Sequence, residues 1–519
     1  MKYIWQVNEI TGRGELQEEN RITVNYHGRI DKVLLTIQME ESDRMFFNGY
    51  QTWTWSPEYN RYGGERGINH LPRALIDKFS LDRYGDYHFY PYGKNRGEIH
   101  GYSYCYFRDK DRYRLFASLS EENGYHLFRY NTRTDRLYIE RDCKGLEVDG
   151  DFTALEFCYL EGGEQEVFDS WFRKLFVIPN TREKLFGYSS WYNRYEDINA
   201  DYIAADLEGC KDILKPGDLF QIDDGWEPNV GDWLEPDPVK FPEGMKASCD
   251  RIHEAGFKAG LWLAPFVCNT SSEIYKNHPD WLLKHEGEPW LDGCNWGGFV
   301  SLDLDNPEVR DYITKVFRRV FDEWGFDLVK LDFLYAGAVF GDEKRTRGGK
   351  MLDAMRWLRD LCAGKLILGC GVPLMPAFGN VDYCRVSCDV SLDWNDKPIM
   401  RIIHKERVST RNAIDTTYYR RQLNNRAFLS DPDVFFLRDD NIKLTLQEKE
   451  YLYTMSALHG GILLTSDNLQ NYDETKKQQL SQVRALFERG RIISEREDSV
   501  TYELDGEIRT LNHRRTSVK

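Results

Sequence analysis

The sequence predicts a multidomain protein in which a central (β/α)8 TIM barrel follows an N-terminal antiparallel β-sandwich and precedes a small C-terminal β element. Short strand-like runs separated by turn residues fill the first ~160 residues. Apolar runs then alternate with helical stretches, which is typical of a parallel sheet. A two-residue alternation returns near the end of the chain. With 519 residues, of which 41% are hydrophobic, there is material for two or three domains.

The first predicted domain, residues 1–163, shows the two-residue period of β-strands. Tyr102, Tyr104 and Tyr106 alternate with Ser103 and Cys105, which predicts a strand with one buried face. Further short runs follow at 115–117 and 137–139, between clusters of Asn, Asp and Gly. This spacing favours a β-sandwich.

Two segments flank the predicted barrel. Residues 164–180 form a linker helix, because their apolar residues have helical spacing up to Leu175 and Pro179 stops the pattern. Residues 468–519 alternate again at Val500, Tyr502 and Leu504, which predicts a short β-rich element.

The barrel is expected over residues 181–467. Its length and its alternation of strands and helices are those of a TIM barrel. A helix is predicted over Met351–Cys362. Eight candidate strands begin near Phe186, Leu219, Lys258, Leu328, Leu366, Tyr383, Val434 and Ile462.

Charge and cysteine content exclude several classes of protein. The net charge of −16 argues against nucleic acid or an anionic membrane as partner. The N-terminal residues lack the apolar core of a signal peptide, and no run approaches the ~18 apolar residues of a membrane span. The 11 scattered cysteines favour a reducing compartment, so we expect a cytoplasmic protein.

Ionisable and aromatic residues gather where the predicted strands end. In a TIM barrel the active site forms at the C-terminal ends of the strands. Five successive strand ends, from the second to the sixth, carry Asp223 and Asp224, then Trp262, then Lys330 and Asp332, then Cys370, and finally Arg385 and Asp389.

Each of these residues taken alone has a structural explanation. Asp223 and Asp224 could form a turn, the Lys330–Asp332 and Arg385–Asp389 pairs could be salt bridges, and Trp262 and Cys370 could be core residues. Structural pairs have no reason to gather at the same end of five strands. The cluster as a whole therefore favours an active site.

Two carboxylates on different strands, facing across a cleft, meet the requirement for glycoside hydrolysis. One would attack the anomeric carbon, and the other would protonate the leaving oxygen. Spacing alone does not assign these roles. None of the 11 histidines forms an HxH or HExxH pattern, so we expect neither a metal nor a cofactor.

At these residues the sequence resembles glycoside hydrolase family 36, the α-galactosidase family related to family 27. The resemblance rests on a series of motifs in order along the chain. They are Asn48-Gly49-Tyr50-Gln51-Thr52-Trp53, Gly187-Tyr188-Ser189-Ser190-Trp191-Tyr192, Gln221-Ile222-Asp223-Asp224-Gly225-Trp226, Gly260-Leu261-Trp262-Leu263-Ala264-Pro265-Phe266, Lys330-Leu331-Asp332-Phe333, Arg385-Val386-Ser387-Cys388-Asp389 and Gly461-Ile462-Leu463-Leu464-Thr465-Ser466-Asp467-Asn468.

The resemblance implies a role for each motif residue. Asp332 would be the nucleophile and Asp389 the acid/base of a retaining mechanism. The other residues would bind substrate: Asp223 and Asp224 the hydroxyls around C4 and C6, Lys330 and Arg385 ring hydroxyls, Trp262 the region of C6, Trp191 and Trp53 the pocket wall, and Cys370 a less defined position. Trp53 would come from the N-terminal domain or from a neighbouring subunit.

The resemblance implies an exo-acting α-galactosidase that removes terminal α-linked galactose from oligosaccharides. An α-N-acetylgalactosaminidase or a raffinose-synthase-like galactosyl transferase would use the same catalytic pair. A metal-dependent barrel hydrolase and a non-catalytic carbohydrate-binding protein are alternatives of other classes. The sequence leaves homo-oligomerisation open. It departs from the family pattern at Ser430-Asp431-Pro432-Asp433, which we expect to lie away from both catalytic residues.

Overall fold

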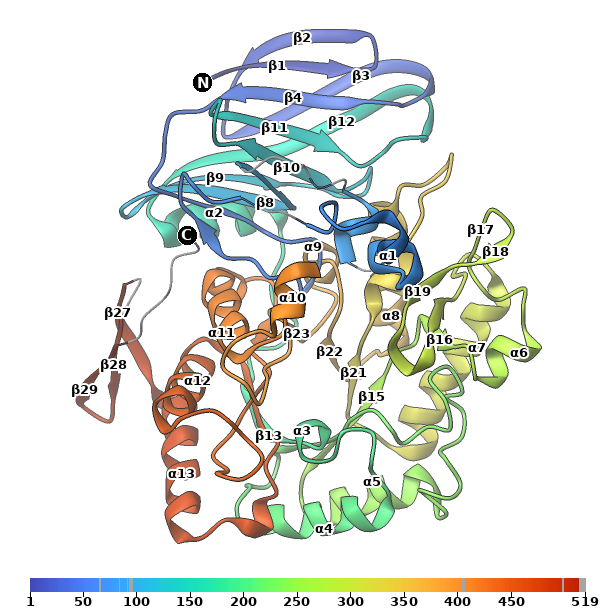
Figure 1. Ribbon diagram of the computed structural model, residues 1–519, viewed down its shortest axis with the longest axis vertical. Helices are drawn as coiled ribbons and strands as arrows, with labels where there is room; N and C mark the ends of the chain where they lie inside the picture. Colours follow the sequence, from blue (N-terminus) through green and yellow to red (C-terminus); the bar gives the residue numbers. More distant parts are fainter. Residues whose placement is uncertain are drawn as a thin grey trace.

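The computed structural model describes residues 1–64, 67–83, 85–90, 92, 97–403, 407–496 and 499–512. Figure 1 shows antiparallel sheets at the top, a central parallel sheet surrounded by helices below them, and a small three-stranded sheet at one side. Along the chain, the antiparallel sheets come first, the parallel sheet follows, and the three-stranded sheet comes last.

Two six-stranded antiparallel sheets make up the N-terminal part. The first has the order β2-β1-β4-β11-β10-β7, with β1 (Lys2–Val7), β2 (Ile10–Glu15), β4 (Val33–Gln38), β7 (Glu98–Tyr102), β10 (His126–Asn131) and β11 (Arg136–Arg141). The second has the order β3-β12-β9-β8-β5-β6, with β3 (Glu19–Arg29), β5 (Arg44–Phe47), β6 (Glu58–Tyr59), β8 (Tyr104–Asp109), β9 (Arg112–Ser118) and β12 (Glu147–Gly162). Both sheets contribute side chains to one buried cluster, as a β-sandwich requires.

The tyrosine run that predicted a single half-buried strand is divided between the two sheets. Ser103 has a φ of 69°, and this left-handed residue separates β7 from β8. Strand β8 is buried on both faces, because Cys105 points into the sandwich core while Tyr104 and Tyr106 join the cluster shared with the barrel. The barrel side of the protein covers the second face of this sheet. A two-residue period predicts one buried face and does not indicate that the other face is buried too.

The central sheet contains nine parallel strands in the order β24-β23-β22-β21-β15-β14-β13-β26-β25. They are β13 (Leu185–Ser189), β14 (Leu219–Ile222), β15 (Lys258–Leu263), β21 (Leu328–Leu331), β22 (Leu366–Gly369), β23 (Tyr383–Arg385), β24 (Leu429–Asp431), β25 (Val434–Phe435) and β26 (Ile462–Thr465).

The two ends of this sheet meet, which gives a TIM-like barrel. Strands β24 and β25 are two pieces of one strand: β24 pairs with β23, and β25 pairs with β26. The Gly461 amide donates to the Ser430 carbonyl at 2.8 Å and joins the ends. The seventh predicted strand begins at Leu429 rather than near Val434, because two of its first three residues are polar and hide it from an apolar pattern.

Helices between and after the strands surround the barrel (Figure 1). They are α3 (Trp191–Arg194), α4 (Ala200–Lys211), α5 (Gly244–Glu254), α7 (Pro307–Arg318), α8 (Arg347–Leu361), α9 (Leu374–Ala377), α10 (Pro398–Ile403), α11 (Thr410–Tyr419), α12 (Leu446–His459) and α13 (Glu474–Arg489). The predicted helix at 351–362 corresponds to α8, which ends one residue earlier, at Leu361. Helix α8 also begins earlier, because the Thr346 side chain accepts the Gly349 amide and caps it.

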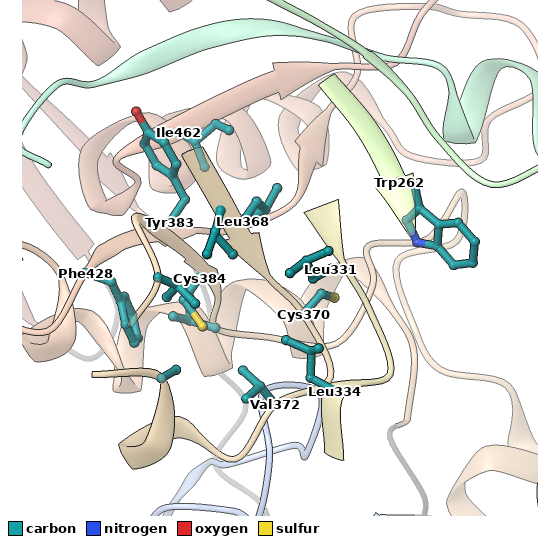
Figure 2. Close-up of a cluster of buried hydrophobic side chains, with 14 of the residues drawn as sticks. Trp262, Leu331, Leu334, Leu368, Cys370, Val372, Tyr383, Cys384, Phe428 and Ile462 are labelled. Carbon is teal, nitrogen blue, oxygen red and sulfur yellow. The ribbon is translucent and has the colours of Figure 1, made fainter. Parts of the chain in front are cut away.

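Buried apolar side chains pack on both faces of the barrel strands. Figure 2 shows Leu331 of β21, Leu368 of β22, Cys384 of β23 and Ile462 of β26 within one buried cluster. Trp262 of β15 lies at the edge of this group, toward the C-terminal ends of the strands. This packing makes the barrel a rigid support for groups at its rim.

Helix α2 (Glu164–Leu175) occupies most of the predicted 164–180 linker and packs between the sandwich and the barrel. The fully buried Trp171 indole donates to the Ser118 carbonyl of β9 at 2.8 Å and contacts Phe378, which follows α9. One aromatic side chain thus contacts both parts.

Two further sheets extend from the barrel. Between β15 and α7 lies an insertion with the sheet β16 (Val267–Asn269), β20 (Phe299–Ser301) and β19 (Leu291–Gly293), helix α6 (Glu273–Asn277) and hairpin β17 (Lys284–His285)–β18 (Glu288–Pro289). Helix α1 (Arg73–Lys78) of the N-terminal part lies close to it (Figure 1). The C-terminal sheet is β27 (Arg491–Arg496), β28 (Ser499–Leu504) and β29 (Glu507–Asn512), so the predicted 468–519 element also contains α13.

Candidate active site

A cavity of about 440 Å³ lies at the C-terminal ends of the barrel strands. It is lined by Trp53, Trp191, Glu196, Asp223, Asp224, Trp262, Asn295, Trp296, Lys330, Asp332, Phe333, Asp389 and Val408. Eight of the ten side chains that the sequence predicted for the site line it, and the other two, Cys370 and Arg385, lie behind the lining.

Asp332 follows β21 directly and is held on both carboxylate oxygens. The Trp262 indole donates to Oδ2 at 3.1 Å, and the Phe333 amide donates to Oδ1 at 3.0 Å. Phe333 has a φ of 53°, and this left-handed conformation turns the chain immediately after the carboxylate. The two hydrogen bonds therefore fix the orientation of the Asp332 carboxylate. The Trp262 indole that donates one of them also forms one wall of the cavity.

Asp389 follows β23 and has different surroundings. Its Oδ1 accepts a 2.6 Å bond from Arg385 Nη1, while 45% of its side chain remains open to the cavity. Desolvation raises the pKa of Asp389 to about 6, with a further contribution from the nearby carboxylates of Asp433 and Asp332 and opposition from Arg385. A carboxyl with this pKa can deliver a proton near neutral pH.

Arg385 lies beneath Asp389 instead of facing the cavity. Besides Asp389, its guanidinium contacts Asp431 Oδ2 at 3.2 Å and Asp433 Oδ1 at 2.9 Å, and it is only 3% exposed. The Arg385–Asp389 salt bridge, which was the structural alternative for this pair, is present. The segment from Ser430 to Asp433, which we expected to lie away from the catalytic residues, thus reaches Asp389 through Arg385.

Lys330 and Asp223 form a buried ion pair at 2.9 Å. Burial alone would lower the pKa of the Lys330 ammonium, yet Asp223 outweighs it and holds the pKa above its usual value. Gln221 and Ser189 also donate to Asp223 Oδ2, at 2.7 and 3.3 Å. Lys330 thus keeps its charge next to both Asp223 and Asp332.

Asp224 and Glu227 form a hydrogen-bonded pair of carboxyl groups. Burial, followed by the charge of Glu227, raises the pKa of Asp224 well above its usual value, and burial also raises the pKa of Glu227. Oδ2 of Asp224 accepts a hydrogen bond from the Trp296 indole at 2.9 Å. Two buried carboxyls in contact favour sharing one proton.

Trp53 reaches the cavity from the N-terminal part of the same chain. Its indole donates to the sulfur of Cys370 at 3.2 Å, so Cys370 anchors the cavity wall from behind. Burial raises the pKa of the Cys370 thiol well above its usual value. The chain passes so close to the indole at Gly371 that an added Cβ would lie 2.8 Å from the Trp53 ring.

A fully buried arginine, Arg420, fastens the loop that carries Trp53 to the barrel. Its guanidinium donates to the Thr52 carbonyl at 2.6 Å, to the Gln51 carbonyl at 3.2 Å and to the Val386 carbonyl at 3.0 Å. Asn48 Oδ1 and Ser56 Oγ accept further bonds. Desolvation lowers the pKa of Arg420 to about 10.

Arg420→Met is expected to lower the free energy of unfolding by about 3–5 kcal/mol, because several buried acceptors lose their donor. Denaturant unfolding measures this loss. Arg112→Met is the matched control: Arg112 forms an ion pair with Glu161 and is largely exposed, so about 0–1 kcal/mol is expected. If both variants lost the same free energy of unfolding, the role of Arg420 in fastening the Trp53 loop to the barrel would be contradicted.

Sequence reasoning missed five residues that line the cavity: Glu196, Asn295, Trp296, Phe333 and Val408. Phe333 was part of a quoted motif but received no role. Asn295 and Trp296 sit in the insertion after β15, far from any barrel strand end. The two glycines that follow Trp296 in the sequence, Gly297 and Gly298, could have predicted a tight turn at this position.

A second cleft, of about 990 Å³, lies between the sandwich, α12 and β27. Its main charges already pair with each other: Arg421 contacts Glu164 at 2.7 Å and Glu495 at 3.2 Å. Size alone therefore does not mark the reactive site, and the smaller cavity holds the oriented carboxylates.

A barrel rim with two carboxylates on one indole-lined cavity is the arrangement that glycoside hydrolysis requires. A protein-family model described as Melibiase matches residues 164–341. An α-galactosidase of Lactobacillus acidophilus is 31% identical over 151 residues, 28% of this chain and 20% of that protein. One of Escherichia coli is 25% identical over 261 residues, 45% of this chain and 36% of that protein. These matches span well under two thirds of the relatives' own length.

Solved structures match over nearly the whole chain. An α-galactosidase of Thermus thermophilus, in complex with p-nitrophenyl α-D-galactopyranoside, has a TM-score of 0.79 and 25% identity and covers 98% of this chain and 96% of its own. The family-36 α-galactosidase AgaA of Geobacillus stearothermophilus shares the fold, with a TM-score of 0.61 at 14% identity, over 96% of this chain and 70% of its own. The predicted resemblance to family 36 is thereby confirmed.

Among the described residues, no group of His, Cys, Asp and Glu is arranged to hold a metal ion. Within the same ranges, no helix is both long and apolar enough to cross a membrane.

Proposed function

We propose that this protein is an exo-acting, retaining α-galactosidase that acts on oligosaccharides in the cytoplasm. The observation that carries the proposal is that the two carboxylates of the family motifs, Asp332 and Asp389, line the same cavity in different electrostatic surroundings. Pairs of carboxyls with such differences divide the roles of nucleophile and acid. The α-galactosidase relatives and the galactoside-bound neighbour support the sugar.

The residues divide the reaction between them. Asp332 is held ready by Trp262 and the Phe333 amide, and it attacks the anomeric carbon to form a galactosyl-enzyme. Asp389 protonates the leaving oxygen and then, as a carboxylate, takes a proton from the attacking water. Arg385 orients Asp389, and it stabilises the carboxylate form that the second step needs.

The remaining lining residues bind the sugar. Asp223, Asp224 and Lys330 supply acceptors and donors for hydroxyl groups, and the indoles of Trp53, Trp191 and Trp262 supply apolar surface for the ring. A cavity of about 440 Å³ suits a terminal sugar unit rather than a long chain. A pocket of this size supports the exo-type cleavage that we propose.

The first test is the release of p-nitrophenol from the α-galactoside, with the α-N-acetylgalactosaminide assayed in parallel. Turnover of the galactoside alone is expected. Turnover of the acetamido sugar alone would place the alternative sugar in the pocket, and product only in the presence of an acceptor sugar would favour the transferase. Binding without turnover would favour a non-catalytic carbohydrate-binding protein. The anomer released first, followed by NMR, tests retention.

The pH profile is expected to report Asp389. A general acid works in its protonated form, so kcat/KM for an unactivated oligosaccharide should be highest below the Asp389 pKa of about 6. Above that pH it should fall about tenfold per unit. Stopped assays on raffinose between pH 4 and 8 measure this limb. A constant kcat/KM up to pH 8 would contradict the role of Asp389.

A further inference from the structure

The indole of Trp296 holds one of the carboxylates in the cavity. Its Nε1 donates to Asp224 Oδ2 at 2.9 Å, and the side chain is itself part of the cavity lining. Trp296 comes from the turn Asn295–Gly297 between β19 and β20, in the insertion outside the barrel. An element outside the barrel therefore contacts a carboxylate that follows strand β14.

The backbone at this turn is shaped to aim the indole. Trp296 has a φ of 51° and is followed by Gly297 and Gly298 with φ of 80° and 121°. A large residue in the left-handed region costs free energy, and such residues persist where the surroundings fix them. Here the ring is fixed by Phe333 and Phe299, with centroids 4.9 and 5.5 Å away.

Trp296 also contacts the indole that holds Asp332. The Trp296 and Trp262 ring centroids are 6.1 Å apart at 59°, and Trp262 donates to Asp332 Oδ2. Two touching indoles thus each hold one carboxylate. The position of Asp224 relative to Asp332 is set through this pair.

Resting on the proposed function, we propose that Trp296 is a positioning residue for substrate recognition. Its N–H fixes the rotation of the Asp224 carboxyl, so that Asp224 presents its hydrogen-bonding edge to a sugar hydroxyl while the anomeric carbon lies at Asp332. The insertion between β15 and α7 thereby contributes to sugar selection through Trp296.

A double-mutant cycle tests this role. Trp296→Phe keeps a ring and loses the donor. It should lower kcat/KM for p-nitrophenyl α-galactoside about 10–100-fold, the range for a hydrogen bond to a charged partner, here the Asp224–Glu227 pair that shares one proton and carries one negative charge. In the background of Asp224→Ala, where the acceptor is absent, the same change should cost less than about twofold. Full losses in both backgrounds would overturn the proposal.

Trp281→Phe is the matched control. Trp281 lies in the same insertion and donates Nε1 to Glu308 Oε2 at 2.8 Å, but it does not line the cavity. This variant should keep kcat/KM within about twofold of the wild type. A loss equal to that of Trp296→Phe would mean that the effect comes from loosening the insertion, and would overturn positioning through Asp224.

Indole NMR gives a readout that does not depend on turnover. In protein labelled with indole-¹⁵N tryptophan, Trp296→Phe identifies the Trp296 resonance, and Asp224→Ala should shift that resonance while the Trp281 resonance stays in place. An unshifted Trp296 resonance would overturn the proposal. If the wild type cleaves no α-galactoside, the proposed function fails, and the NMR result still decides whether Trp296 holds Asp224.

Discussion

Asp332→Asn is expected to lower kcat for p-nitrophenyl α-galactoside by roughly 10⁴-fold or more, because the amide cannot form the glycosyl-enzyme bond. The fold should survive the change. Both hydrogen bonds to Asp332 come from donors, the Trp262 indole and the Phe333 amide. An asparagine carbonyl can still accept one of them, so the loss reports chemistry and not unfolding.

Covalent trapping identifies the nucleophile directly. A 2-deoxy-2-fluoro galactosyl reagent should add one sugar to the wild type, seen as a mass increase, and the label should map to the peptide that contains Asp332. Asp332→Gly should give no label. Asp250→Asn is the control, because Asp250 pairs with Lys246 on the surface of α5, and it should label and turn over like the wild type. Full turnover by Asp332→Asn would refute the assignment.

The sequence predicted well those site residues that lie at the ends of the barrel strands. Lys330 lies in β21, and Asp223, Asp332 and Asp389 follow parallel strands. Parallel strands end at one rim, so order along the chain implied proximity in space. The alternation of apolar runs and helical stretches located seven barrel strands and the second piece of the eighth, β25. This prediction succeeded because each strand and each helix of the barrel gives its own short hydrophobic pattern, and these patterns alternate regularly along the chain.

The partners of these residues were harder to predict. Arg420 lies 368 positions from Thr52, and Trp296 lies 72 positions from Asp224. No short-range sequence pattern connects residues so far apart. Arg420 binds backbone carbonyls of a distant loop, and nothing in its neighbouring sequence indicates that it will be buried there. Cys370 and Arg385 were predicted to bind substrate, whereas the structure places them behind Trp53 and Asp389. Whether a buried side chain lines the cavity or lies behind another residue is a property of the folded chain.

Asp389→Ala is expected to affect substrates according to their leaving groups. An unactivated oligosaccharide needs a proton on the departing oxygen, so its kcat/KM should fall about 10³–10⁴-fold. A dinitrophenyl galactoside leaves as a stable anion and should lose less than about tenfold in kcat/KM, the parameter that reports formation of the glycosyl-enzyme. Its kcat should fall further, because the second step loses its base.

Azide separates the two roles of Asp389. This anion needs no general base, so it should restore kcat of Asp389→Ala on the dinitrophenyl substrate and give a galactosyl azide of retained configuration. Asp393→Ala is the control, since Asp393 pairs with Lys443 outside the cavity and should leave all substrates unaffected. Equal losses on both substrates, without rescue by azide, would remove Asp389 as the acid. Asp389 would then serve only as a partner of Arg385, and the proton donor would have to be sought among the other carboxyls that line the cavity.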